Sequence, residues 1–169
     1  MQSKLIGLGL VGALTLSACG GGLLGDPKSP DVSGKLNGAW PADTRLTLGG
    51  VNENGIFTDG NNQTQIVDTN LTDGYTFDLP ETVPQGGYAV IAYVDGSNGH
   101  PKDGQYQLGE TASQDNGKTL IYSNQAATVF GQTVGAGWSL WDRNAKTVAP
   151  VSAFPNRTFS GYDLTYPAQ

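Results

Sequence analysis

The sequence predicts an all-β protein whose main domain is an antiparallel β-sandwich. The 169 residues include 25 glycines together with abundant Asn, Asp and Thr, a composition that favours turns and short strands. Eight or so short apolar or alternating segments lie between these turns, and no amphipathic helix is recognisable after residue 25. Short strands without intervening helices pack as two antiparallel sheets.

One segment is predicted to form the central strand of this fold. Tyr88–Val94 is apolar at seven consecutive positions, without the apolar–polar alternation of a strand that has one solvent-exposed face. Such a run indicates a strand that is buried on both faces. We therefore expect this segment to lie inside a sheet and not at its edge.

The other strands are predicted from alternation and from the turns that bound them. Tyr75–Leu79 alternates cleanly, with its aromatic and leucine side chains on one face and Thr76 and Asp78 towards water. Gly49–Gln63 is rich in Gly and Asn, and is predicted to be a long loop or a loose hairpin. The remaining predicted strands are Val32–Leu36, Thr44–Leu48, Gln65–Thr69, Lys118–Ser123, Ala126–Phe130, Trp138–Trp141, Thr147–Val148 and Thr158–Tyr166.

The succession of three segments carries a resemblance to a known class of domain. The strand GYTFDLP (74–80), a proline-containing connection and the strand GYAVIAYVD (87–95) lead into a loop of Asp, Asn and Gly. This order resembles prealbumin-like and carboxypeptidase-regulatory-like β-sandwich domains over residues 73–110. The resemblance implies a prealbumin-like or immunoglobulin-like sandwich, and it implies that the loop binds calcium.

The amino terminus has the pattern of a bacterial lipoprotein signal. Lys4 precedes an apolar run of 14 residues, Leu5–Ala18. As a helix this run would rise about 21 Å, which is too short for a hydrocarbon core of about 30 Å. The run therefore indicates a secretory signal. It ends in Leu16-Ser17-Ala18-Cys19, which resembles the lipobox of bacterial lipoproteins.

The lipobox resemblance predicts a domain organisation and a cellular location. It implies cleavage before Cys19, a diacylglyceryl group on its sulfur and acylation, by palmitate for example, of its new amine. Two or more acyl chains give stable membrane anchoring. We expect a signal peptide at 1–18, a lipidated cysteine and flexible tether at 19–31, and one β-sandwich domain at 32–169. Gly20 after the cysteine favours the outer membrane or outer surface of the cell envelope.

Charge and cysteine content exclude several classes of function. Lys4 leaves with the signal, so 8 of the 9 cations remain against 15 acids and the mature chain has a formal charge of −7. A chain this acidic does not neutralise phosphates, so nucleic acid is not an expected partner. With Cys19 lipidated, no second cysteine is present to form a disulfide.

The loop after the central strand collects oxygen-bearing side chains. They are Asp95, Ser97, Asn98, Asp103 and Glu110. Calcium takes six to eight oxygen ligands, which these side chains and backbone carbonyls could supply. The same residue types are also ordinary in solvated turns, which is the competing interpretation. Calcium is the one cofactor that the sequence suggests.

The sequence offers little support for catalysis. His100 is the only histidine, and it lies in a polar loop beside a proline. One His and one Cys cannot build a typical zinc site, and no G-x-x-x-x-G-K-[ST] motif is present to hold a nucleotide phosphate. Carboxylates could serve a glycoside hydrolase, but the acids are scattered over loops without a preferred pair.

Aromatic residues point to binding as an alternative function. Trp141 is predicted on the opposite face of its strand from Trp138, and together with Tyr106 it could stack on a sugar. The competing interpretation is that Trp138 lies in the core and Trp141 is half-buried under a loop. We expect a non-enzymatic, lipid-anchored accessory or interaction module with an envelope protein or glycan as partner. The alternatives are a carbohydrate- or cell-wall-binding domain and, less favoured, a carboxylate-based glycoside hydrolase.

Overall fold

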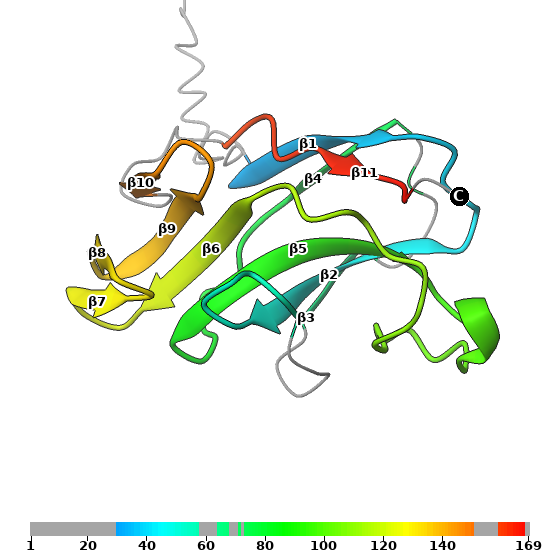
Figure 1. Ribbon diagram of the computed structural model, residues 1–169, viewed down its shortest axis with the longest axis horizontal. Helices are drawn as coiled ribbons and strands as arrows, with labels where there is room; N and C mark the ends of the chain where they lie inside the picture. Colours follow the sequence, from blue (N-terminus) through cyan, green and yellow to red (C-terminus); the bar gives the residue numbers. More distant parts are fainter. Residues whose placement is uncertain (1–29, 58–63, 68–70, 72, 151–158, 168–169) are drawn as a thin grey trace, which may run out of the picture.

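The computed structural model describes residues 30–57, 64–67, 71, 73–150 and 159–167 (Figure 1). Within these ranges the chain is nearly all β, as predicted. The elements are β1 (Val32–Asn37), β2 (Thr44–Val51), β3 (Thr64–Val67), β4 (Gly74–Phe77), β5 (Gly86–Val94), the 3-10 turn η2 (Ser97–Gly99), β6 (Lys118–Ser123), β7 (Ala127–Val129), β8 (Gln132–Val134), β9 (Gly137–Asp142), β10 (Thr147–Pro150) and β11 (Leu164–Thr165). The predicted signal peptide, Cys19 and most of the tether lie outside the described residues.

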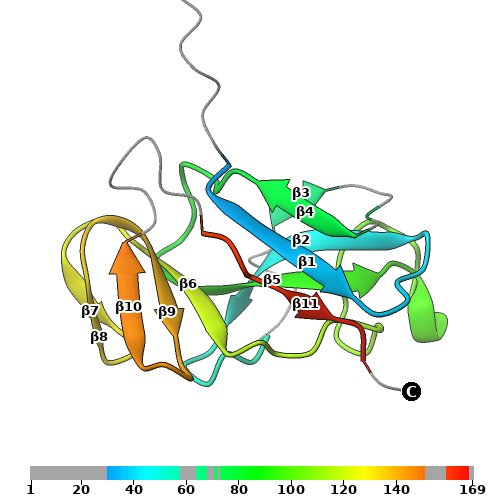
Figure 2. The same cartoon turned by 90° about the horizontal axis from the view of Figure 1, so that it is seen from above.

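Two sheets pack face to face as a sandwich. The larger sheet has six antiparallel strands in the order β10-β9-β6-β5-β2-β3, and the smaller has the order β11-β1-β4. Figures 1 and 2 show the smaller sheet lying over the larger one, with β1 crossing the direction of β2 and β5. The hairpin β7-β8 lies at one end of the molecule.

The main core fills the space between the two sheets. Because side chains alternate along a strand, every second residue of each sheet points into this layer. The fully buried members include Val32, Leu46, Leu48, Ala92, Leu120, Tyr162 and Leu164. Trp138 also belongs to this core, and its indole Nε1 donates to the carbonyl oxygen of Pro80 at 2.9 Å.

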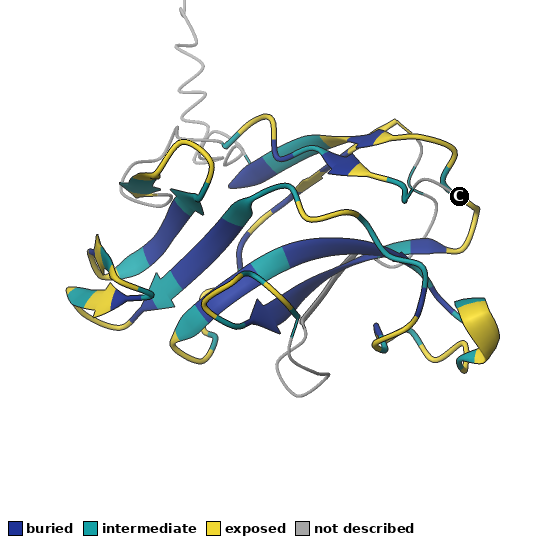
Figure 3. Ribbon diagram, viewed as in Figure 1, coloured by how far each residue is buried: buried dark blue, intermediate teal, exposed yellow. Residues whose placement is uncertain are grey.

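The larger sheet is also covered on its outer face, which explains the unbroken apolar run of β5. Val90 and Ala92 point into the main core, whereas Ile91 and Tyr93 point outwards and are buried under Tyr106. A second outer cluster gathers around Ile121, Val129 and Val134. Figure 3 shows β5 and β6 buried along most of their length. The prediction that Tyr88–Val94 is an interior strand is therefore confirmed.

The structure corrects the sequence prediction at the carboxyl-terminal strand. Thr158–Tyr166 was expected to be one strand, but regular pairing is confined to Leu164–Thr165, with an isolated bridge between Val32 and Phe159. Gly161 takes a positive φ of 79°, which interrupts the extended backbone. The short strand runs parallel to β1, the single parallel pair among the described strands.

A second difference is the strand β8, which alternation did not reveal. The predicted strand Ala126–Phe130 shortens to β7 because Phe130 and Gly131 form a two-residue turn with φ angles of 49° and 71°. Positive φ at both central positions is the geometry of a type I′ hairpin turn. The chain therefore reverses at once into Gln132–Val134, which pairs with β7.

Tyr162 ties the smaller sheet to the larger one where β5 and β6 separate. These strands pair over Gly86–Tyr88 and then diverge. The buried Tyr162 hydroxyl donates to the carbonyl oxygen of Lys118 at 3.1 Å and accepts the amide of Val90 at 3.3 Å. One side chain from the segment just before β11 thus links the two strands across their opening.

Candidate functional site

The predicted calcium loop follows β5 and is closed by its own hydrogen bonds. The carboxylate of Asp95 is fully buried and forms an ion pair with Arg45, with 2.8 Å between Oδ2 and Nε. It also accepts the backbone amides of Asp103 and Gly104, each at 3.2 Å. Asp95 therefore organises the loop from inside.

The other predicted ligands make similar contacts. The two carboxylate oxygens of Glu110 accept the amides of Gly96 at 2.7 Å and Gln107 at 2.9 Å. Ser97 Oγ accepts the amide of Thr111 at 2.7 Å, Asn98 donates to the carbonyl of Gly109, and Asp103 accepts the Gln107 side chain. The part of the chain that the structure describes contains no group of three or more His, Cys, Asp or Glu residues that could hold a metal. These contacts support a structural role, and calcium binding stays a prediction.

The two aromatic residues predicted to bind a ligand lie in different clusters. Trp141 is half-buried on the outer face of β9, where its ring stacks on Phe130 with 6.5 Å between centroids. Tyr106 is buried and packs against Phe57 at 4.8 Å and Tyr93 at 5.5 Å. The opposite facing of Trp138 and Trp141 is thus as expected, but the structure does not bring Trp141 and Tyr106 into one cluster.

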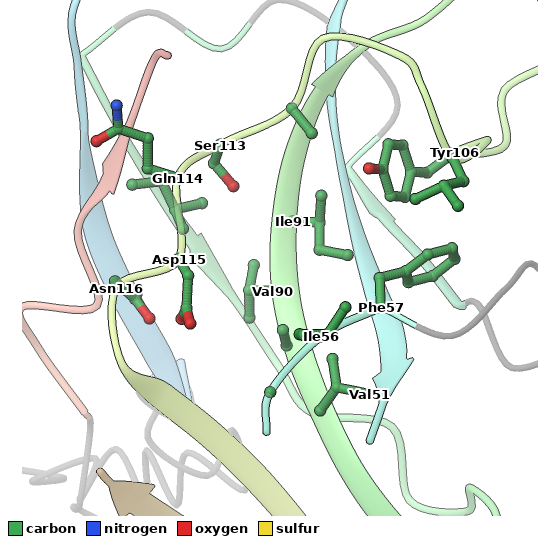
Figure 4. A pocket seen from close by; sticks show the side chains of 15 residues that line it. Val51, Ile56, Phe57, Val90, Ile91, Tyr106, Ser113, Gln114, Asp115 and Asn116 are labelled. Carbon is green, nitrogen blue, oxygen red and sulfur yellow. The ribbon is translucent and has the colours of Figure 1, made fainter. Parts of the chain in front are cut away.

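Tyr106 instead lines a groove that opens beside β5 on the outer face of the larger sheet (Figure 4). The groove exists because the segment 111–116, which first pairs with β5, separates from it before β6 begins at Lys118. Residues 111–113 pair with the end of β5, and the amide of Ser113 donates to Ala92 at 2.7 Å. The amide of the next residue, Gln114, donates to Thr165 in the smaller sheet at 3.0 Å. This departure leaves a cavity of about 260 Å³ between β5 and 113–116.

One wall of the groove is apolar. Its members come from the end of β2, the following turn, β5 and the loop around Tyr106: Val51, Ile56, Phe57, Ala89, Ile91, Tyr106, Leu108 and Ala112. Val90 and Leu164, both members of the main core, also line the cavity. The groove therefore reaches from the outer face of the sheet towards the layer between the sheets.

Two exposed side chains stand at the mouth of this apolar wall. Ile56 is 59% exposed and Leu108 is 72% exposed, and they are the large hydrophobic residues found exposed among the described positions. Single exposed apolar side chains are common on proteins, but two that meet at one cavity extend its apolar surface outwards. This arrangement distinguishes the groove from the rest of the described surface.

The facing wall is polar and carries one acid. It consists of Ser113, Gln114, Asp115 and Asn116, which Figure 4 shows along the segment opposite β5. Arg143, from the turn between β9 and β10, pairs with Asp115 and also donates to the carbonyl of Asn54. Arg143 thereby joins the segments that carry the two walls.

Two tyrosines next to the groove have a raised pKa. Burial raises the pKa of Tyr106, and the nearby carboxylate of Glu110 raises it further. Burial is also the main cause of the raised pKa of Tyr93, with Asp95 as the second cause. At neutral pH these rings therefore contribute apolar faces and hydroxyl dipoles.

Sequence reasoning missed the groove because its residues come from four separate segments. Ile56–Phe57 and Leu108 were visible only as isolated apolar residues in polar loops. Their meeting depends on the pairing of Val51 with Phe57 and on the packing of Phe57 against Tyr106. Neither contact has a signature in the local sequence.

Comparisons with known proteins add no family to this description. No family model, no curated protein and no solved structure matches the chain. The resemblances noted in the sequence therefore stay expectations. Among the residues that the structure describes, no helix has the length and apolar character needed to cross a membrane.

Proposed function

We propose that the protein is a non-enzymatic, lipid-anchored module of a bacterial cell envelope that binds an accessory ligand or partner through the groove. The observation that carries this proposal is the position of Ile56 and Leu108. Both are exposed, and both line the apolar wall of one cavity. Ligand sites typically combine a concave apolar surface with a few polar groups, as this groove does.

The chemistry of the groove supports binding over catalysis. General acid–base catalysis needs titratable groups poised at the reacting atoms, and a glycoside hydrolase needs two carboxylates. Asp115 is the one carboxylate among the described lining residues, and its Oδ1 already accepts the amide of Gly117 and pairs with Arg143. The groove therefore lacks the second acid that the hydrolase alternative requires.

The binding proposal is tested most directly by photo-crosslinking in intact cells. A benzophenone amino acid replaces Leu108 at the mouth of the groove or, as a control, the exposed Asp78 just after β4, which lines neither the groove nor the second cavity, on the smaller sheet. We expect a defined adduct from position 108 and none from position 78. Equal crosslinking from position 108 and from the control position, or no crosslinking from position 108, would contradict binding at the groove.

The anchor is proposed to be the diacylglyceryl and acyl groups on Cys19, which would place the domain at the outer membrane or outer surface. Two chains are enough for stable attachment. Labelling with radioactive palmitate should mark the wild type and not Cys19→Ser. A Cys19→Ser/Ser29→Cys double variant is the matched control, because it keeps one thiol but removes it from the lipobox. Palmitate incorporation into that variant would contradict the assignment.

Glycan binding is the second candidate, and the half-buried state of Trp141 favours it. Part of this ring is accessible on the outer face of the larger sheet. Sugar stacking would change its tryptophan fluorescence, and Trp141→Ala should abolish binding to cell-wall glycans. Val148→Ala, in the same cluster, is a control that removes apolar area without removing the ring. A glycan titration that leaves the fluorescence unchanged would exclude this candidate.

A further inference from the structure

We infer that the groove selects its ligand by charge: it takes a small molecule with an apolar ring or branched body and an uncharged or cationic donor end, and it rejects anions. This inference rests on the proposed binding function and names the chemical class that the site would accept. Amines, amides and hydroxyl compounds fit this description. Fatty acids and phosphate or sulfonate compounds do not.

The body of the ligand is set by the apolar wall and by the size of the cavity. The cavity holds about 260 Å³, whereas an apolar cavity of about 150 Å³ already accepts benzene. The space beside Ile91 and Phe57 therefore suits one or two rings or a branched chain. Burying such a group against Ile56 and Leu108 removes apolar surface from water on both partners, which favours binding.

The donor end is set by Ser113 and Asp115 of the polar wall, whose oxygens can accept hydrogen bonds. Ser113 Oγ accepts the amide of Ala92 at 3.3 Å, which places this oxygen on the groove side of β5. Asp115 adds a carboxylate whose side chain is 57% exposed. A ligand N–H or O–H that meets these oxygens keeps its hydrogen bonds when it leaves water.

Anions are disfavoured because the described groove offers no cation to receive them. None of its lining residues is Lys, Arg or His. The Nη2 and Nη1 groups of the nearby Arg143 donate to Asp115 and to the carbonyl of Asn54, and its side chain is only 18% exposed. An anionic group would lose hydration on entering the groove without a cation among the described lining residues to receive it.

Two fluorescent probes that differ by one charged group test the inference. N-phenyl-1-naphthylamine is neutral and carries an N–H donor between a two-ring naphthalene, which suits the cavity, and a phenyl ring, which would lie at its mouth. 8-Anilinonaphthalene-1-sulfonate is the same molecule with a sulfonate. The protein is the mature chain from residue 19 with Cys19→Ser, so that no detergent competes for the probes. Cooperative thermal unfolding is checked first. We expect the neutral probe to bind at least tenfold more tightly than the sulfonate.

Variants connect this preference to the groove. Ile56→Ser/Leu108→Ser changes two exposed residues and should weaken binding of the neutral probe severalfold. Asp115→Asn removes a negative charge and frees the guanidinium of Arg143, so the preference for the neutral probe over the sulfonate should fall below tenfold. Asp78→Asn changes the net charge equally, just after β4 in the other layer, and should leave the preference intact.

The outcomes separate the inference from the function on which it rests. If the two probes bind with equal affinity, and the Ile56→Ser/Leu108→Ser variant weakens the binding of both, charge selection is overturned but the groove is still a binding site. A folded protein that binds neither probe would overturn both, as would binding that the double variant leaves unchanged. A preference that Asp78→Asn narrows as much as Asp115→Asn would assign the selectivity to net charge and overturn the role of the polar wall.

Discussion

The hydroxyl of Tyr75 on β4 donates a hydrogen bond to the backbone carbonyl of Tyr162, just before β11. The two residues lie on opposite sides of β1, which pairs with β4 along one edge and with β11 along the other. The ring of Tyr75 reaches its partner by passing over Gly34 of β1, where no side chain intervenes. Tyr162 in turn forms hydrogen bonds with β5 and β6, so this contact connects β4 to the larger sheet through Tyr162.

Gly34→Ala should destabilise the fold strongly. A Cβ at this position would lie 2.1 Å from the carbonyl oxygen of Tyr162 and 2.8 Å from the hydroxyl of Tyr75. Forcing an atom into such a packed site costs about 2–3 kcal/mol. Urea unfolding should therefore show a lower midpoint for this variant. Gly135→Ala is the matched control, because nothing lies within 4 Å of the place that its new Cβ would take; an equal loss in both variants would contradict the role of Gly34.

The protein should lose stability above pH 10. Burial is the largest cause of the raised pKa of Tyr75, Tyr93 and Tyr162. Their unfolded pKa is about 10, so the folded state keeps protons that the unfolded state releases. The stabilisation that comes from keeping these rings neutral is complete below pH 10, and it falls as the pH rises towards the folded pKa values. Each group contributes a slope of up to about 1.4 kcal/mol per pH unit.

The measurement is a pair of alkaline titrations followed by tyrosinate absorbance and by circular dichroism. We expect ionisation of the buried tyrosines to coincide with unfolding. Tyrosinate absorbance that rises fully near pH 10 while the β-sheet spectrum is retained would show that these rings are accessible in the folded protein.

Asp95→Ala should remove about 3 kcal/mol of stability. The variant leaves Arg45, whose side chain is 17% exposed, without its carboxylate, and breaking a buried pair costs about 3–5 kcal/mol. It also removes the acceptor of two loop amides. Asp43→Ala breaks the exposed pair with Lys102, where both side chains are more than half exposed, and should cost less than about 1 kcal/mol. Urea unfolding of the two variants would compare the pairs; equal losses would contradict the structural role of Asp95.

Calcium should raise the thermal unfolding midpoint only modestly. The carboxylates of Asp95 and Glu110 already accept backbone amides, so the loop is closed without a cation. Melting is compared in calcium and in chelator, and Glu110→Gln should abolish the rise. No difference between calcium and chelator would contradict the metal site predicted from the sequence.

Arg143→Ala should loosen both walls of the groove while changing global stability little. Its guanidinium lies against Gly55 and pairs with Asp115, whose side chain is 57% exposed, and a pair with one solvent-exposed partner contributes about 1 kcal/mol or less. Hydrogen exchange should accelerate at the amides of Gly55 and Gly117, which bond within the two segments. The amide of His100, in the loop after β5, is the internal control. Unchanged exchange at Gly55 and Gly117 would show that the segments hold their positions without Arg143.

Much of the fold was predictable because strand formation here follows local patterns. The alternation of Tyr75–Leu79 and the apolar run of Tyr88–Val94 both depend on which faces of a strand are buried, and both strands lie as expected. The predicted length of the last strand was too great because Gly161, with its positive φ, interrupts a stretch whose side chains otherwise alternate regularly. β8 was missed because the turn at Phe130 requires a positive φ in a residue type that rarely adopts it.

The sequence by itself determined the all-β class, the interior position of β5 and the opposite facing of Trp138 and Trp141, because each follows from the two-residue period of a strand. Only the tertiary structure decided the roles of the candidate residues. Asp95 and Glu110 became supports of a loop because backbone amides within hydrogen-bonding distance satisfy them. The groove forms because the chain at Gln114 leaves β5 and bonds to Thr165 of β11 instead. This contact joins residues far apart in the sequence, so no local sequence pattern predicts it.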